Sequence, residues 1–465
     1  MFRIGGQTIP VKTLVLVVCD AAFIVVGLLV ATAIRFHDLR AIQAYLYANN
    51  TYARFGLVVL VCQLALYYHD MYDFRFSSRR SEIFVRLLQA FGVSCLVLAL
   101  LYYLAPELSL GRGIALLAAL TILALTLGFR LILDATGFWH RRPENLLIVG
   151  TGAAGISLAR EIGSRRELSV RVVGFLDEKG KNIGKSLVNP GIIGSVQDVE
   201  SLVGRKKIDR VVLSLTERRG HTPVRQLLHL KFRGVPVEDV HSLYERITGR
   251  ILLERLAPSW LIFSDGFRKS VFLLTTKRAM DIVVSLLAII LASPLIGAIS
   301  LAIWLETRSP MFYRQMRVGL GGRPFEILKF RSMYQNAEDN GPRWATKHDP
   351  RVTRVGRFLR KYRLDELPQL FNVVRGEMSL VGPRPERPEF CTGLEQQIPL
   401  FSLRHSLRPG ITGWAQIKYQ YGSSVEETQQ KLEYDLFYIK HLSITLDMAI
   451  LFETTKVVLY GRGAK

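Results

Sequence analysis

Two adjacent carboxylates, Asp365 and Glu366, lie in a segment that is rich in arginine and proline. The segment reads RKYRLDELPQLFNVVRGEMSLVGPRPE and runs from Arg360 to Glu386. Nearby cations favour the ionised form of Asp365, and an ionised aspartate among arginines can bind Mg²⁺ or attack phosphorus. Arg384 stands between two prolines, where its forked guanidinium is suited to phosphate oxygens. These residue types indicate phosphoryl chemistry, with a surface salt-bridge network as the alternative.

The sequence before this acid pair has the period of a helix. In DPRVTRVGRFLRKYRLDEL, one face is shared by Val355, Leu359 and Tyr362, and another by basic side chains. We expect this helix to reach the acid pair, which would place Asp365 on the basic stripe and turn Glu366 toward the apolar side. A basic face beside an apolar face predicts a helix that lies in the plane of a membrane surface.

The composition of the chain suits a surface that is both apolar and anionic. Its 465 residues carry a formal net charge of +22, and 49% of them are hydrophobic. A phospholipid bilayer has both properties, whereas the long apolar runs argue against nucleic acid as the partner. The four cysteines form no CxxC pair, so the sequence supports neither a zinc site nor a disulfide framework.

Four apolar runs have lengths that suggest membrane helices: Thr13–Ile34, Phe55–Met71, Leu87–Leu104 and Ile114–Leu133. Arginines cluster between residues 73 and 86 and again directly after the fourth run, so we expect both segments to be cytoplasmic. Asp20 is an acid inside the first run, and we favour a packing role for it over a direct functional one. Arg130, near the end of the fourth run, is expected to reach the membrane surface.

Asn145–Val240 alternates apolar strands with helical segments, which is typical of a parallel, Rossmann-like α/β domain. Gly150, Gly152 and Gly155 form a GxGxxG pattern between a strand and a helix, where a pyrophosphate could approach the backbone. Asp177, at the end of the second strand, could hold a ribose. No Tyr-x-x-x-Lys follows, so we favour a scaffolding or regulatory domain over a dinucleotide enzyme, and a bound nucleotide stays open.

Ala279–Leu305 is a fifth apolar stretch, and both of its flanks are basic. Ser293 and Pro294 stand in its middle, where the proline removes a backbone donor and bends a helix. Because both basic flanks favour the cytoplasm, we expect a re-entrant helix that breaks at Ser293-Pro294 and returns on the same side. A proline-kinked spanning helix is the alternative.

Five motifs from about Lys277 to Gly461 carry a resemblance to a known family. They are KRAMDIVVSLLAIILASPLIGAI, ILKFRSM, RKYRLDELPQLFNVVRGEMSLVGPRP, RPGITGWAQIKY and EYDLFYIKHLS, in that order. They resemble the bacterial polyprenyl-phosphate sugar-1-phosphate transferases, which are monotopic phosphoglycosyl transferases. The N-terminal half resembles the large members of that family, in which four membrane helices and a Rossmann-like domain precede the catalytic core.

The resemblance implies a reaction and a location. A UDP-sugar would donate sugar-1-phosphate to undecaprenyl phosphate, giving undecaprenyl-diphosphate-sugar and UMP. This would be the first membrane step of exopolysaccharide or capsule synthesis. The protein would be a multi-pass protein of the bacterial inner (cytoplasmic) membrane, with its catalytic domain facing the cytoplasm.

The resemblance also implies roles for individual residues. Asp365 would be the nucleophile that forms a phospho-sugar ester, and Glu366 would support it through Mg²⁺ ligation or proton handling, so both are the expected metal ligands. Trp414 suits core packing and the nucleotide site equally well. Further substrate contacts are expected from Lys329, Arg331, Arg384, Asp435 and Gln416.

The expected fold is a membrane α+β protein with a mainly α catalytic domain. Its parts would be a four-helix transmembrane region (1–140), a Rossmann-like domain (141–250), a linker (251–276) and the catalytic domain (277–465) with the re-entrant helix 279–305. One competing hypothesis is a membrane-anchored nucleotide-sugar oxidoreductase or dehydratase, against which the missing Tyr-x-x-x-Lys argues. The other is a catalytically silent scaffold, against which the intact acid pair argues. The sequence does not determine which sugar is transferred or whether the protein forms a homo-oligomer.

Overall fold

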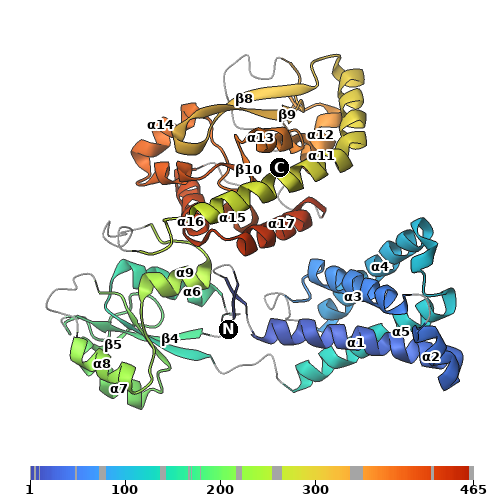
Figure 1. Cartoon of the computed structure of the whole chain (residues 1–465). Coiled ribbons are helices and arrows are strands. Elements are labelled where there is room, and N and C mark those ends of the chain that lie inside the picture. The colour runs from blue at the N-terminus through green and yellow to red at the C-terminus, as the bar shows by residue number, and fades with distance from the viewer. Residues whose placement is uncertain are drawn as a thin grey trace.

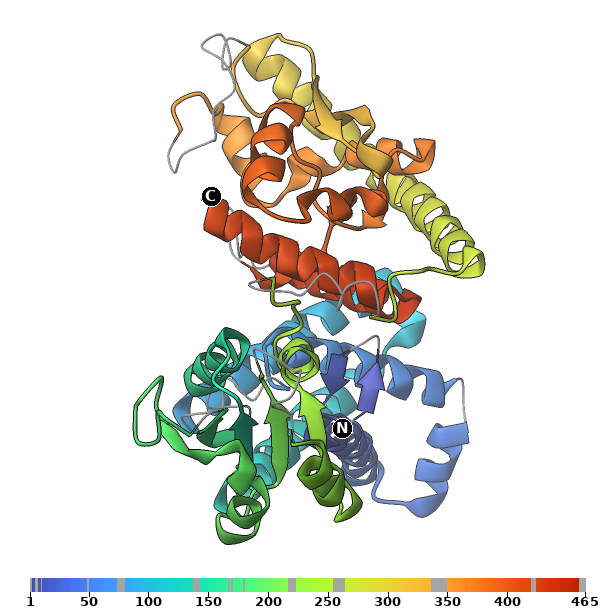
Figure 2. The same ribbon diagram turned by 90° about the vertical axis from the view of Figure 1, so that its left-hand side faces the viewer.

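The chain forms three units that follow one another in sequence: a bundle of long helices, a parallel α/β sheet domain and a mainly helical unit (Figure 1). The turned view shows the third unit on one side of the other two (Figure 2). The computed structural model describes residues 2–4, 7–9, 11–47, 50–72, 80–136, 143–165, 168, 170–178, 180–215, 223–253, 264–335, 349–419 and 424–459.

Four long helices make up most of the first unit: α1 (Val11–Phe36), α3 (Thr51–Tyr68), α4 (Arg80–Leu104) and α5 (Arg112–Ala135). They share one apolar core, to which Ile24, Cys62, Leu87 and Ile122 belong. Each predicted membrane run is confirmed as a helix that is long and apolar enough to cross a membrane, although α3 ends before the predicted Met71. Two short elements were not predicted, the hairpin β1–β2 (Phe2–Ile4 and Gln7–Ile9) and helix α2 (Leu39–Tyr47).

A buried ion pair ties α1 to α5 inside the bundle. Arg130 donates to Asp20 over 2.7 Å and to the carbonyl of Met71 over 3.0 Å, and both charged side chains are buried. Arg130 therefore does not reach the membrane surface as predicted, because a carboxylate on the neighbouring helix holds it in the core. The same pair supports the packing role expected for Asp20. The arginines 75, 79, 141 and 142, which were expected to orient the bundle, lie outside the described residues.

Five parallel strands form the sheet of the second unit, in the order β5-β4-β3-β6-β7. They are β3 (Glu144–Val149), β4 (Val170–Asp177), β5 (Ile192–Ser195), β6 (Arg210–Leu213) and β7 (Val237–Asp239). One face packs on α6 (Ala153–Ser164) and α9 (Val240–Thr248), and the other on α7 (Val199–Arg205) and α8 (Val224–Phe232). The predicted parallel α/β domain is confirmed, but the sequence pattern did not indicate β5.

The third unit begins with the long helix α11 (Val271–Thr307) and the hairpin of β8 (Phe312–Val318) and β9 (Pro324–Phe330). The elements that follow are α12 (Arg354–Lys361), α13 (Gln369–Arg375), β10 (Ser379–Val381), α14 (Pro388–Gln397), β11 (Gly410–Thr412), α15 (Trp414–Lys418), α16 (Val425–His441) and α17 (Ile444–Leu459). Strands β10 and β11 pair in parallel, and α16 runs through the core, where Leu436 and Phe437 are fully buried.

Helix α11 bends at its proline but is not interrupted. Pro294 lies inside the helix, and α11 changes direction along its length (Figure 1). Near its start α11 contacts α13, where Arg278 donates to the carbonyl of Val373, and near its end it contacts α12, where Glu306 accepts from the N–H of Arg354. The predicted break at Ser293-Pro294 is thus a bend within one helix. This helix also starts at Val271, inside the segment that was expected to be a linker.

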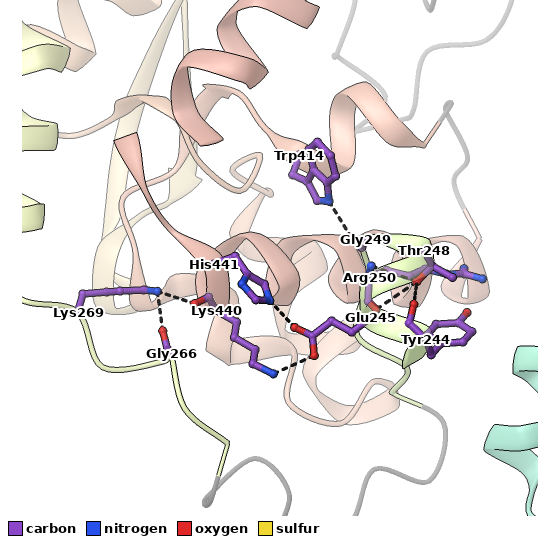
Figure 3. Close-up of polar contacts among 10 residues, drawn as sticks. All are labelled: Tyr244, Glu245, Thr248, Gly249, Arg250, Gly266, Lys269, Trp414, Lys440 and His441. Atoms are coloured by element: carbon purple, nitrogen blue, oxygen red, sulfur yellow. Dashed lines mark hydrogen bonds and ion pairs between the residues drawn. The ribbon is translucent and has the colours of Figure 1, made fainter. Parts of the chain in front are cut away.

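The sheet domain and the third unit pack against each other where the predicted linker begins. Ile251 belongs to the core of the third unit, and Leu252, the next residue, belongs to the core of the sheet domain. Beside them, Glu245 on α9 accepts from Lys440 over 2.8 Å and also pairs with His441, at the end of α16 (Figure 3). The start of the predicted linker is therefore part of both cores.

Candidate active site

The acid pair lies on a tight turn between two helices. Helix α12 ends at Lys361, and Arg363 then takes a left-handed backbone conformation with φ of 54°. Leu364–Glu366 form one 3-10 turn, and α13 begins at Gln369. The prediction of a helix that reaches the acid pair is wrong, because a positive φ at a non-glycine residue ends that helix before the acids.

Glu366 is the anionic centre of this turn. Its Oε1 lies 2.9 Å from Nη2 of Arg384, 3.4 Å from Nζ of Lys329 and 4.0 Å from Nη1 of Arg363. Burial opposes the ionisation of Glu366, but these three cations outweigh it and hold the pKa of this carboxyl well below its usual range. The prediction that Glu366 turns toward the apolar side is therefore wrong, since this side chain is buried among cations.

Asp365 has the opposite character. It is partly buried, and within the described part of the chain no group is hydrogen-bonded to or ion-paired with its carboxylate. Burial raises the pKa of Asp365; Lys329 opposes this effect and Glu366 adds to it. The prediction that cations favour the ionised form of Asp365 is wrong in its net effect, because the cations act chiefly on Glu366. A carboxylate without a partner keeps its lone pairs available for attack on an electrophile.

Lys329 reaches the turn from β9, and Asn372 holds that strand against α13. Asn372 is fully buried; its Oδ1 accepts from the N–H of Leu328 over 3.0 Å, and its Nδ2 donates to the carbonyl of Glu326 over 2.7 Å. Because α13 directly follows the acid pair, this amide sets the spacing between Lys329 and Glu366. The sequence analysis missed Asn372, for which the available signal was an amide among the apolar residues of LPQLFNVV.

Arg384 lies in the loop after β10, and a second arginine holds that loop. Nη2 of Arg404 donates to the carbonyl of Arg384 and to Oδ2 of Asp435, both over 2.9 Å. Burial raises the pKa of Asp435 to about 6, against the opposing effect of Arg404. Asp435 is thus linked to the acid pair through two arginines and not by direct contact.

Two other expected site residues are bonded elsewhere. Arg331 donates to a carbonyl just before β8 over 2.8 Å, and Gln416 donates to a carbonyl of β11 over 3.2 Å. Neither is linked to the acid pair by a hydrogen bond or ion pair in the portion of the chain described. Trp414 serves core packing, since it is 3% exposed and its Nε1 donates to the carbonyl of Gly249 over 2.7 Å (Figure 3).

Comparison with known proteins assigns the third unit to a family. Residues 272–461 match the family described as bacterial sugar transferase. A UDP-glucose:undecaprenyl-phosphate glucose-1-phosphate transferase of Klebsiella pneumoniae is 46% identical over 334 residues, which cover 70% of this chain and 70% of that protein. The chain belongs to the bacterial sugar transferase family.

Two further relatives have names that contain different sugars. The UDP-N-acetylgalactosamine-undecaprenyl-phosphate N-acetylgalactosaminephosphotransferase of Aeromonas hydrophila is 44% identical over 231 residues, which cover 50% of this chain and 54% of that protein. The undecaprenyl-phosphate glucose phosphotransferase of Komagataeibacter xylinus is 35% identical over 341 residues, or 72% of this chain and 62% of that protein. The match thus spans little more than half the length of these two relatives.

A second family, described as CoA-binding domain, matches residues 68–237 of this chain, a range that includes the glycine turn before α6. Gly150 in that turn has φ of +102°, and the N–H of Gly155 donates to the hydroxyl of Ser214 over 2.8 Å. A Cβ at Gly155 would lie 2.7 Å from that hydroxyl, so the glycine allows the end of β6 to pack directly on α6. Asp177 is buried and accepts from the N–H of Lys181 in its own loop. These contacts suit a structural role, and a bound nucleotide stays a prediction.

The acid pair offers carboxylate oxygens of the kind that bind Mg²⁺. In the described segments, no group of three or more His, Cys, Asp or Glu side chains is arranged to hold a metal ion. Mg²⁺ is commonly bound through one or two carboxylates together with substrate phosphates. The unpartnered carboxylate of Asp365 and the second oxygen of Glu366 fit that pattern.

Charged groups fix α11 to the rest of the sugar transferase core. Lys277 donates to Oδ2 of Asp447 over 2.7 Å and to the carbonyl of Val381 over 3.0 Å, and Asp281 accepts from the hydroxyl of Ser379 over 2.7 Å. Val381 and Ser379 both belong to β10, which leads into the loop of the site arginine. The sequence analysis treated Lys277 only as a membrane flank, because Asp447 is 170 positions away along the chain.

Proposed function

We propose that this chain transfers sugar-1-phosphate from a UDP-sugar to undecaprenyl phosphate and releases UMP. The names of its relatives support the acceptor and the reaction type. The observation that carries the proposal is the contrast within the acid pair: among the described residues no group is hydrogen-bonded to or ion-paired with Asp365, whereas Glu366 is paired with three cations. Such a site offers a nucleophile and, next to it, positive charge for a phosphate.

In the first step, a carboxylate oxygen of Asp365 attacks the phosphorus that carries the sugar. An aspartyl O–P bond forms, the phosphoanhydride P–O bond breaks, and its electron pair leaves with UMP. In the second step, an oxygen of undecaprenyl phosphate attacks the same phosphorus, and the carboxylate of Asp365 departs. One phosphoanhydride replaces another, so the site must supply positioning and charge neutralisation rather than energy.

The basic residues around Glu366 neutralise the phosphate oxygens in both steps. The side chain of Arg384 is 34% exposed, so its guanidinium can meet a substrate phosphate while it contacts Glu366. Burial lowers the pKa of Lys329, and Glu366 opposes that effect. Mg²⁺ held by Asp365, Glu366 and the donor diphosphate would neutralise further charge when bound.

The test uses UDP-glucose and UDP-N-acetylgalactosamine, each labelled with ³²P at the phosphate next to the sugar, without a lipid acceptor. Label should stay on the wild-type protein, be absent from Asp365→Asn, and leave when undecaprenyl phosphate is added. Glu389→Gln, at an exposed position on α14, is the matched control and should keep the label. Labelled Asp365→Asn, or UMP release without any labelled protein, would exclude Asp365 as the nucleophile.

We further propose that α11 is re-entrant and that the catalytic unit faces the cytoplasm at the bacterial inner membrane, where its product would start exopolysaccharide or capsule synthesis. Both ends of α11 contact the same unit: Lys277 pairs with Asp447, and Glu306 accepts from the N–H of Arg354 over 2.8 Å. Between them, apolar side chains such as Leu291 are exposed. A spanning helix would separate its ends by about 30 Å of hydrocarbon, so contacts of both ends with one unit support re-entry.

Single cysteines on the two flanks of α11 test this topology. Arg268→Cys and Arg308→Cys both lie at exposed positions, one before and one after the helix. In intact cells, a thiol reagent that does not cross membranes should label neither, and in inverted vesicles it should label both. Labelling of one flank from each side would reject re-entry.

A further inference from the structure

Four successive carbonyl groups in the loop of Arg384 each accept one hydrogen bond. Those of Pro383 and Glu386 accept from backbone N–H groups of β11 and β8, both over 2.9 Å. Those of Arg384 and Pro385 accept from side chains, Arg404 over 2.9 Å and an arginine of β8 over 3.1 Å. The loop therefore has a fixed backbone position that depends in part on Arg404.

Arg404 is in turn held by Asp435 on α16. The Nη2 atom that donates to the loop also donates to Asp435 over 2.9 Å, and the guanidinium carbon lies 5.1 Å from the ring centre of Phe401. Arg404 and Asp435 are 5% and 2% exposed. Asp435 is therefore enclosed in the core, where it cannot meet a substrate without opening the fold.

We propose that Arg404 and Asp435 are positioning residues for the transfer reaction. They hold the backbone of Arg384 so that its guanidinium lies against Glu366 and faces the transferred phosphate. The effect on rate rests on the function proposed above. The sequence analysis expected Asp435 to bind substrate, whereas this inference assigns it a role that acts through Arg384.

The backbone position matters because the loop around Arg384 is stiff. Pro383 and Pro385 have fixed φ angles, and the residue before a proline is restricted as well. The position of the backbone therefore determines where the guanidinium of Arg384 can lie. Misplacing a group that contacts the reacting phosphate by about 1 Å can lower a rate by about 100-fold.

Asp435→Asn tests the inference with little change in volume. It weakens the hold on Arg404, so kcat for UMP release should fall by about 10-fold or more, while KM for the donor should change less. Glu433→Gln is the matched control, because it removes another buried carboxylate of α16 that holds Leu253 and Arg250 of the domain junction. This control should lower Tm and leave kcat unchanged.

A double-mutant cycle decides whether Asp435 acts through Arg384. In the background of Arg384→Lys, Asp435→Asn should have little further effect on kcat. The inference would be overturned if the fold-losses in kcat of the two single variants multiplied in the double variant. A normal kcat in the Asp435→Asn single variant would also overturn it.

Hydrogen–deuterium exchange of residues 382–387 gives a readout that does not depend on activity. Exchange should rise in Asp435→Asn and not in Glu433→Gln, and equal exchange in wild type and Asp435→Asn would overturn the positioning role. Failure of the wild type to release UMP from any UDP-sugar would count against the proposed function, while the exchange measurement would still decide the role of Asp435.

Discussion

Removing the charge of Lys277 should destabilise the catalytic unit far more than removing a surface ion pair. Lys277 is 7% exposed, Asp447 is 0% exposed, and their charged atoms lie 2.7 Å apart. In Lys277→Met, the buried carboxylate loses its cation and the carbonyl of Val381 loses a donor. Breaking a buried pair by removing one partner costs about 3–5 kcal/mol. For a unit of this size, the corresponding fall in Tm is about 6–20 °C.

Thermal unfolding in detergent measures this effect, with two controls. Adding Asp447→Asn to Lys277→Met removes the stranded charge and should recover part of the stability, because the hydroxyl of Tyr438 can still donate to the amide oxygen. Arg314→Met removes an exposed pair with Glu326 and should change the free energy of unfolding by less than about 1 kcal/mol. If Lys277→Met melts within about 2 °C of the wild type, the buried pair does not stabilise the unit as reasoned here.

Three other changes test separate parts of the molecule. Glu366→Gln removes the negative charge that Lys329, Arg363 and Arg384 surround and should lower kcat for UMP release by about 100-fold or more; a rate near wild type would contradict this. Gly155→Ala puts a methyl group 2.7 Å from the Ser214 hydroxyl and should cost about 1–3 kcal/mol in urea unfolding, whereas Gly163→Ala, in open space on the same helix, should not destabilise. Burial raises the pKa of Asp435 from 3.8 to about 6, so stability should fall by about 3 kcal/mol as pH rises through that interval. Unfolding at several pH values should show that slope in the wild type and not in Asp435→Asn.

Periodicity in the sequence predicted those elements whose environment is uniform along their length. The membrane runs and the strand that ends at Asp177 are mainly apolar, so hydrophobic pattern alone located them. The prediction that Arg130 reaches the membrane surface was wrong, and the sequence around Arg130 gives no sign of this. Its partner Asp20 lies 110 positions away on another helix, and only the packed bundle brings the two together.

The acid pair was found from residue type and spacing, but its local geometry was not. The helical period before it is real and ends at Lys361, yet the chain turns at Arg363, a residue type that rarely adopts a positive φ. The turn is stabilised by contacts of Glu366 with Lys329 on β9 and with Arg384, and both residues lie outside the segment that forms the turn. A local pattern cannot predict a turn whose stabilising partners come from elsewhere.

The turn also explains how two neighbouring carboxylates acquire different chemistry. Successive residues of a 3-10 turn point about 120° apart, so Asp365 and Glu366 diverge as the chain leaves Arg363. Glu366 turns toward cations from three segments, which stabilise its charge, while Asp365 turns to a partly buried place where burial raises its proton affinity. When two neighbouring carboxyl groups have different proton affinities, they can take different roles, one as the nucleophile and the other as a fixed charge. A straight continuation of α12 would have changed how both side chains face Lys329 and Arg384, so this division of roles depends on the chain turning where it does.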